Sequence, residues 1–190
     1  MPPEPLAEHA ASRRFQPLRW LGAEPSQREG LVFGLLLALL AALPVLVAAY
    51  PQMVDYPAHL ARYHVMLERD ASPFLQRYYG FEWRLMGNLG VDLLIRPLAA
   101  IMPLESAGRL VAGLLPVLCG LGIVSVDWAL RRRVGLGSVL AFVFVWSPSL
   151  LLGFLNFVLA LALALFAFAG WVLLEGKRWR VWLYMSIGLI

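Results

Sequence analysis

Two long stretches of this chain contain no Lys, Arg, Asp, Glu or His. The first covers residues 30–54 and the second residues 134–174, which are 25 and 41 residues long. A run of about 20 apolar residues crosses a bilayer as a helix. The second stretch would make a straight helix of about 60 Å, twice the ~30 Å hydrocarbon core, so it must fold back as a hairpin. Trp146, Ser147, Pro148 and Ser149 interrupt this stretch and predict the break.

The composition places the chain among integral membrane proteins. Of its 190 residues 61% are hydrophobic and only 15% are charged, and the mean hydropathy is +0.72. Soluble domains carry about 25% charged residues. The net charge of +4 comes from short basic clusters beside the apolar runs, a pattern that sets membrane topology. We therefore expect membrane lipids, and no nucleic acid, among its partners. The lone Cys119 allows no disulfide within the chain.

The sequence predicts an all-α fold, a polytopic transmembrane helical bundle at residues 31–190 that follows a disordered cytoplasmic tail at residues 1–30. A cleaved signal peptide is the alternative for the first run, which is longer than the apolar core of such a peptide. A ten-residue apolar end is too short to cross a bilayer. We therefore expect this sequence to be the N-terminal piece of a larger protein or a truncated reading frame. The expected spans are about residues 31–50 with a kink at Pro44, 106–130, 135–147, 150–174, and 181–190 as an incomplete span.

The basic clusters predict the orientation. The tail, Arg131–Arg133 and Lys177–Arg180 are separated by two crossings each, so all three can be cytoplasmic. Residues 51–105 then form an outer loop on the same side as the hairpin tip. Asp127 is expected to form a local ion pair with Arg131 at the cytoplasmic end.

Two interfacial helices are predicted within this outer loop. The first runs from Ala58 to about Arg69, with Pro57 in its first turn and Asp55 near its N-cap. Its apolar and polar residues alternate as in a helix that lies on a membrane surface. The second runs from Asn88, as the cap, to Ile101, and its residues Asp92 and Arg96 are four apart and can pair.

Three segments carry a resemblance to a known family. They are Asp55-Tyr56-Pro57-Ala58-His59 after the first span, Asn88-Leu89-Gly90-Val91-Asp92-Leu93-Leu94 at the second loop helix, and Gly153-Phe154-Leu155-Asn156-Phe157 at the fourth span. With the layout of spans, they make residues 30–175 resemble bacterial GT-C glycosyltransferases. The resemblance implies a multi-pass protein of the inner (cell) membrane that uses a polyprenyl-phosphate sugar donor. It also implies that Asp55 is the general base, although no second acidic residue adjoins it.

The candidate site residues each have a structural alternative. Asp55 can also serve as a helix N-cap. His59, one helical turn further on, could orient Asp55 or contact a phosphate, or be a hydrated interfacial residue. Arg62 and Arg84 could bind a lipid phosphate, because a guanidinium matches phosphate oxygens, or could face solvent. Asn156 could contact the substrate or form a helix–helix hydrogen bond.

Other interpretations remain open at this point. An Asp55/His59 pair could bind a divalent metal, but two ligands make a weak site, so no cofactor is expected. The function predicted is glycosyl transfer to an extracytoplasmic acceptor. The alternatives are a non-catalytic membrane protein, either a transporter fragment or an assembly partner, and an inactive remnant. No P-loop and no dinucleotide-binding glycine motif is present.

Overall fold

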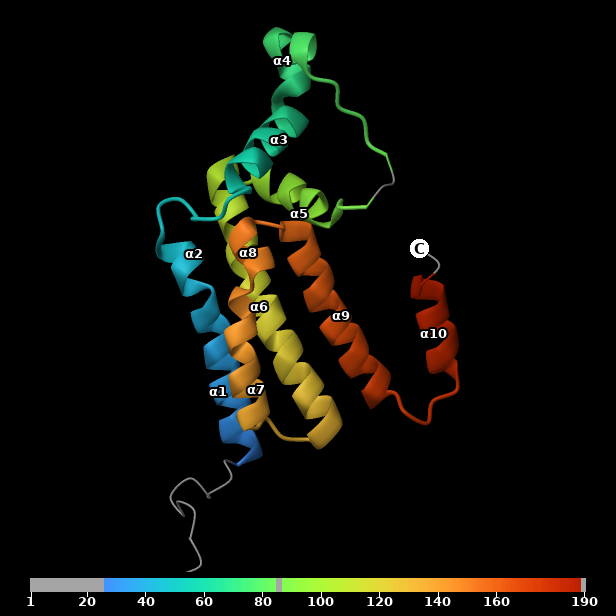
Figure 1. Ribbon diagram of the computed structural model, residues 1–190. Coiled ribbons are helices and arrows are strands. Elements are labelled where there is room, and N and C mark those ends of the chain that lie inside the picture. The colour runs from blue at the N-terminus through green and yellow to red at the C-terminus, as the bar shows by residue number, and fades with distance from the viewer. Residues whose placement is uncertain (1–25, 85–86, 189–190) are drawn as a thin grey trace, which may run out of the picture.

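The computed structural model describes residues 26–84 and 87–188, and they form helices joined by turns and short irregular segments, with no strand among them (Figure 1). Residues 1–25 of the predicted tail lie outside the described residues. The helices in chain order are α1 (Gln27–Ala41), α2 (Leu43–Val47), α3 (Tyr56–Glu68), η2 (Arg69–Ala71), α4 (Pro73–Tyr78), α5 (Gly90–Ala99), α6 (Leu104–Arg131), α7 (Leu136–Ala141), η3 (Phe142–Trp146), α8 (Pro148–Leu152), α9 (Leu155–Leu173) and α10 (Trp179–Gly188).

Among the described residues, three helical segments are long and apolar enough to cross a membrane. They are Gln27–Val47, Leu104–Arg131 and Leu155–Leu173, with 21, 28 and 19 residues. The segment Leu136–Leu152 is apolar but shorter. The predicted all-helical architecture is therefore confirmed for the described residues, and the three long helices are consistent with a membrane protein.

The 28-residue α6 is the centre of the bundle. It contacts α1, α2, α3, α5, α7 and α9, and its most apolar part is the most buried of the three long segments. Small residues allow the neighbouring helices to come close, as is usual within membranes. A β-carbon at Gly120, for example, would lie 3.0 Å from the β-carbon of Ala38 on α1.

The first long segment begins earlier than predicted and is broken near its proline. Ser26 and Glu29 form a capping box, which starts α1 at Gln27. The helix is interrupted at Ala42 and resumes as α2, with Pro44 in the first turn of the new helix. Proline is tolerated there because the missing N–H would have had no helical partner.

The hairpin in the long uncharged stretch reverses later than predicted. Pro148 occupies the first position of α8, so the helix resumes after Ser147 instead of turning back. The chain reverses at Gly153, which has φ +86°, and at Phe154, and then enters α9. Glycine adopts this left-handed conformation without the steric cost of a β-carbon.

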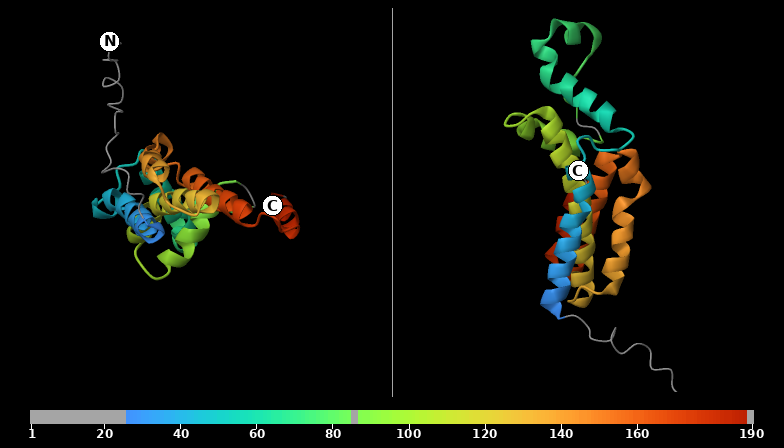
Figure 2. Two further views of the ribbon diagram at one scale, coloured as in Figure 1. Left: turned by 90° about the horizontal axis from the view of Figure 1, so that it is seen from below. Right: turned by 90° about the vertical axis from the view of Figure 1, so that its left-hand side faces the viewer.

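The two ends of the bundle differ in character. The start of α1, the end of α6 and the end of α9 lie at one end, while α3, α4 and α5 lie at the other (Figures 1 and 2). At the first end the predicted Asp127–Arg131 ion pair is present, and Asp127 also accepts hydrogen bonds from the Gly135 N–H (2.9 Å) and the Ser138 hydroxyl. These bonds fix the turn between α6 and α7.

Candidate functional site

A polar cavity of about 280 Å³ lies at the end of the bundle that carries α3 and α5. Three separate parts of the chain contribute to it: the first turns of α3 with the residue before that helix, Asn88 two residues before α5, and the turn that enters α9. Its lining residues are Asp55, His59, Arg62, Asn88, Phe154, Leu155, Asn156 and Phe157. Four of the five predicted site residues, Asp55, His59, Arg62 and Asn156, therefore meet in one cavity.

Asp55 is at the N-cap position of α3, but its side chain makes no capping hydrogen bond. Its backbone N–H donates instead to the Leu152 carbonyl at 3.0 Å. No hydrogen bond or ion pair holds the Asp55 carboxylate within the described residues. The carboxylate is therefore available to a ligand, and the side-chain cap considered as the structural alternative is not formed.

His59 connects α3 to the hairpin turn. Its Nε2 lies 3.0 Å from the Gly153 carbonyl oxygen, and its ring stacks on Tyr63 with centroids 5.9 Å apart. A carbonyl only accepts, so Nε2 carries the proton in this contact. His59 thus has a positioning contact that residue spacing along the chain does not predict.

Arg62 forms an ion pair with Asp92 of α5, with 2.6 Å between Nη2 and Oδ2. Asp92 is 1% exposed and its Oδ1 has no partner among the described residues, while Arg62 is 42% exposed. Burial raises the pKa of the Asp92 carboxyl, and the Arg62 guanidinium opposes this shift. Arg62 is thereby held at the cavity with most of its N–H groups still unused.

The predicted pair between Asp92 and Arg96 is wrong. The Arg96 guanidinium lies 5.5 Å from the ring centroid of Trp83, a cation–π contact. Asp92 faces the interior of the bundle, where the Arg62 side chain reaches it from another helix. The four-residue spacing identified two residues able to pair but not the direction in which Asp92 points.

Tyr63 adds a second polar group to this buried region. Its hydroxyl is buried and has no hydrogen-bond partner among the described residues. Burial raises the pKa of the Tyr63 hydroxyl, and the nearby Asp92 carboxylate adds to the shift. Sequence reasoning did not select Tyr63, because a tyrosine on the apolar face of a helix resembles an ordinary core residue.

Asn156 supports α5 from outside that helix. Its Oδ1 accepts a hydrogen bond from the Val91 N–H at 2.9 Å, which satisfies one of the free donors at the helix start. The predicted capping role of Asn88 is wrong, since α5 has Leu89 at its N-cap position with no side-chain cap, and Asn88 has φ +68°. Asn156 therefore makes the interhelix hydrogen bond that was one of its two alternatives, while still lining the cavity.

Arg84 lies apart from the other candidates. It pairs with Glu82 at 2.6 Å, and both side chains are more than 70% exposed. It does not line the cavity. Across residues 26–84 and 87–188, no three His, Cys, Asp or Glu side chains gather as a metal-binding set.

The described residues form an all-helical bundle with three helices that are long and apolar enough to cross a membrane, and with a polar cavity at one end. Comparison with known proteins found no matching family model, no matching curated protein and no matching solved structure.

The ion pair at the cavity gives a pH-dependent prediction. We expect Arg62→Met to lower the free energy of unfolding by about 1–3 kcal/mol near neutral pH, because it leaves the buried Asp92 carboxylate unpaired. The range lies below the ~3–5 kcal/mol of a fully buried pair, since water screens the half-exposed guanidinium. Thermal unfolding in detergent micelles measures the difference between variant and wild type.

The sign of the pH effect follows from the raised pKa of Asp92. As pH rises, the Asp92 carboxyl loses its proton in the unfolded state at a lower pH than in the folded state. The free-energy cost of burying the Asp92 carboxylate therefore appears only above its ordinary pKa of 3.8. The penalty of Arg62→Met should therefore shrink as pH falls toward that value. Arg84→Met, whose partner is exposed, is the control and should have a small effect. A penalty independent of pH would contradict the assignment.

The tight turn at Gly153 gives a second prediction. A β-carbon there would lie 3.0 Å from the Asp55 nitrogen, and the residue also has a left-handed φ. Gly176 has φ +83° but nothing within 4 Å of a built β-carbon. Backbone strain should lower the free energy of unfolding of both Gly153→Ala and Gly176→Ala by about 1–2 kcal/mol. The close contact with Asp55 should lower the free energy of unfolding of Gly153→Ala by about 1 kcal/mol or more in addition. Equal melting temperatures for the two variants would show that this contact is unimportant.

Proposed function

We propose that this protein is a membrane glycosyltransferase of the GT-C kind, which transfers a sugar from a polyprenyl-phosphate donor to an acceptor outside the cytoplasm. The observation that carries the proposal is the Asp55 carboxylate, which has no hydrogen-bond or ion-pair partner among the described residues and lies in a polar cavity at one end of an apolar helical bundle. The resemblance of the segments around Asp55, Asn88 and Gly153 supports it. The proposed location is the bacterial inner membrane, with the N-terminus in the cytoplasm.

In this proposal Asp55 is the general base. Its carboxylate accepts the proton of the acceptor hydroxyl as the acceptor oxygen bonds to the anomeric carbon of the sugar. The bond from that carbon to the donor phosphate oxygen breaks, and the phosphate leaves with the electron pair. Attack from the face opposite the phosphate inverts the anomeric centre. A positioned base of this kind contributes about 10²–10⁴-fold to a rate.

Arg62 is the proposed phosphate contact. A guanidinium has five N–H donors, and the bond to Asp92 uses one of them. Because Asp92 holds the side chain in place, little rotamer freedom is lost when the remaining donors bind phosphate oxygens. The Asn156 amide keeps its two N–H donors for the substrate, since only its Oδ1 bonds to α5. The exposed Arg84 has no role in this mechanism.

The proposed orientation places the cavity on the outer face of the membrane. In support, the basic residues at the ends of α6 and α9 share one end of the bundle with the start of α1 (Figure 1). Basic residues of short loops favour the cytoplasmic side. The helices α3 and α5 would then be the interfacial pair of the outer loop, and α5 lies across the end of the bundle (Figure 1).

The catalytic assignment is tested by Asp55→Asn. We expect this variant to reduce glycosyl transfer by about 10²-fold or more, because an amide cannot accept the hydroxyl proton, while its level in the membrane stays unchanged. Transfer of labelled sugar from a polyprenyl-phosphate donor in purified membranes measures the rate. Asp70→Asn is the matched control, because Asp70 lies in the same loop but is 93% exposed and outside the cavity. Wild-type rates in Asp55→Asn would remove Asp55 from the mechanism.

The orientation is tested separately with reporter fusions. An alkaline phosphatase fused after Ser72 should be active, because it would lie outside the cytoplasm, and one fused after Gly176 should be inactive. Enzyme activity normalised to protein level measures both. The opposite pattern would place the cavity on the cytoplasmic side and separate it from the proposed donor.

A further inference from the structure

Both asparagines of this chain, Asn88 and Asn156, line the polar cavity, although they are far apart in the sequence. No glutamine is among the described residues that line it. An asparagine amide carries two N–H donors and an acceptor oxygen on one side chain. The cavity therefore brings two groups that both donate and accept beside the Asp55 carboxylate and the Arg62 guanidinium.

Asn88 has a backbone conformation that does not itself require an amide. Its φ of +68° is in the left-handed region, which asparagine tolerates better than most residues and glycine adopts without steric cost. Arg132 is the other described residue besides glycine with a positive φ, and it ends α6. Asn88 ends no helix and does not cap α5, and no hydrogen bond holds its amide within residues 26–84 and 87–188. A glycine would make the same turn, so the Asn88 amide is left for a ligand.

The segment that carries Asn88 is fixed against α9. The Asn156 Oδ1 accepts a hydrogen bond from the Val91 N–H at 2.9 Å. A β-carbon at Gly90 would lie 2.9 Å from the Leu159 side chain, so the start of α5 packs closely on α9. These contacts hold the two asparagines at one cavity before a ligand binds.

A ligand rich in hydroxyl groups matches this set of side chains. A hydroxyl both donates and accepts a hydrogen bond, as an amide does. Phe154 and Phe157 add an apolar wall, which can pack against the C–H groups of a sugar ring. The volume of about 280 Å³ equals that of about nine water molecules at ~30 Å³ each, which suits one sugar ring but no longer glycan.

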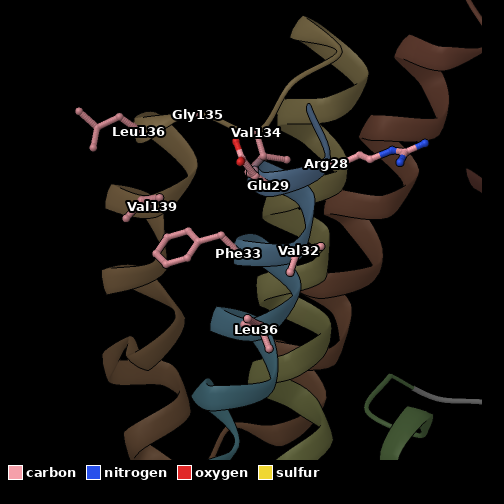
Figure 3. Close-up of a pocket in the computed structure, with 10 residues that line it drawn as sticks. Arg28, Glu29, Val32, Phe33, Leu36, Val134, Gly135, Leu136 and Val139 are labelled. Atoms are coloured by element: carbon pink, nitrogen blue, oxygen red, sulfur yellow. The ribbon is translucent and has the colours of Figure 1, made fainter. Parts of the chain in front are cut away.

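The larger hollow at the other end of the bundle differs in its chemistry. It has a volume of about 810 Å³ and lies between α1 and the segment that enters α7, with Phe33, Leu36 and Val139 on its walls (Figure 3). Arg28 and Glu29 bring charge to it, but no amide side chain is among the described residues that line it. Of these two hollows, the polar cavity is the one whose chemistry matches a ligand rich in hydroxyl groups.

We propose that the Asn88 and Asn156 amides determine sugar specificity by binding the hydroxyl groups of a single sugar ring, whose phosphate lies at Arg62. This inference rests on the proposed function and adds to it the residues that recognise the sugar part of the donor. Asn88 is the sharper test of the two, because its amide makes no bond within the described residues, whereas Asn156 also supports α5.

The test measures binding without turnover. The full chain in detergent micelles is titrated by calorimetry with farnesyl phosphate and with farnesyl-phosphoryl glucose, mannose, galactose, N-acetylglucosamine and arabinose. The wild type should bind the best glycosyl probe roughly tenfold more tightly than farnesyl phosphate. Asn88→Gly should lose about fivefold of this preference and bind farnesyl phosphate as the wild type does. Because glycine accepts the left-handed φ, its melting temperature should match that of the wild type.

Arg132→Gly is the matched control for this experiment. It replaces the other left-handed residue, at the end of α6 away from the cavity, and should leave every affinity unchanged. A full sugar preference in Asn88→Gly, or no preference in the wild type, would overturn this inference and leave the phosphate contact of the proposed function standing. A wild type that binds none of the probes would overturn the proposed function and this inference together.

Discussion

The contact between the hairpin turn and the start of α3 is the interaction on which the candidate site depends. The N–H groups of Val54 and Asp55 donate to the Leu151 and Leu152 carbonyls at 3.2 and 3.0 Å, and His59 bonds to the Gly153 carbonyl. The last carbonyls of a helix have no partner within that helix, and they are costly to leave unpaired inside a protein. The loop after α2 satisfies the last two carbonyls of α8, those of Leu151 and Leu152. The same bonds fix the backbone of Asp55, so its side chain points into the cavity without having to cap the helix.

The α3 side of the cavity is set by helical spacing along the chain. The other two sides depend on contacts between residues far apart in the sequence. The sequence predicted that Asp55 and His59 lie on one helical face, and Arg62 follows His59 at a spacing that keeps it on that face. Asn156 reaches α5 across 65 residues and Arg62 reaches Asp92 across 30. No short-range pattern in the sequence predicts either of these two contacts. Asp92 has an equally spaced alternative partner in Arg96, and helical periodicity cannot decide between a partner on the same helix and one on another helix.

The positions of helix breaks were harder to predict than the existence of the helices. Long uncharged runs predicted the apolar helices, because burying backbone polar groups in hydrocarbon permits few structures besides a helix. Pro148 was a misleading signal, since proline interrupts a helix but also fits its first turn. Gly153 was the residue that reverses the chain. A glycine in an apolar stretch reads equally well as a packing position, as Gly120 shows, so its left-handed conformation became evident only in the structure.

The two buried carboxylates at opposite ends of the bundle show why one end is the better candidate for chemistry. Asp127 is fully used: a guanidinium, a hydroxyl and a backbone N–H all donate to it, and its role is to hold a turn. Asp92 has only Arg62, and one of its oxygens has no partner among the described residues. Buried polar groups are normally satisfied, because an unmade hydrogen bond costs about 1–3 kcal/mol. Asp92 does not line the cavity, but it carries this cost while it holds Arg62 in the cavity wall, where the Asp55 carboxylate has no partner among the described residues. The arrangement lowers stability locally, but it keeps a guanidinium and a carboxylate in place before any substrate arrives.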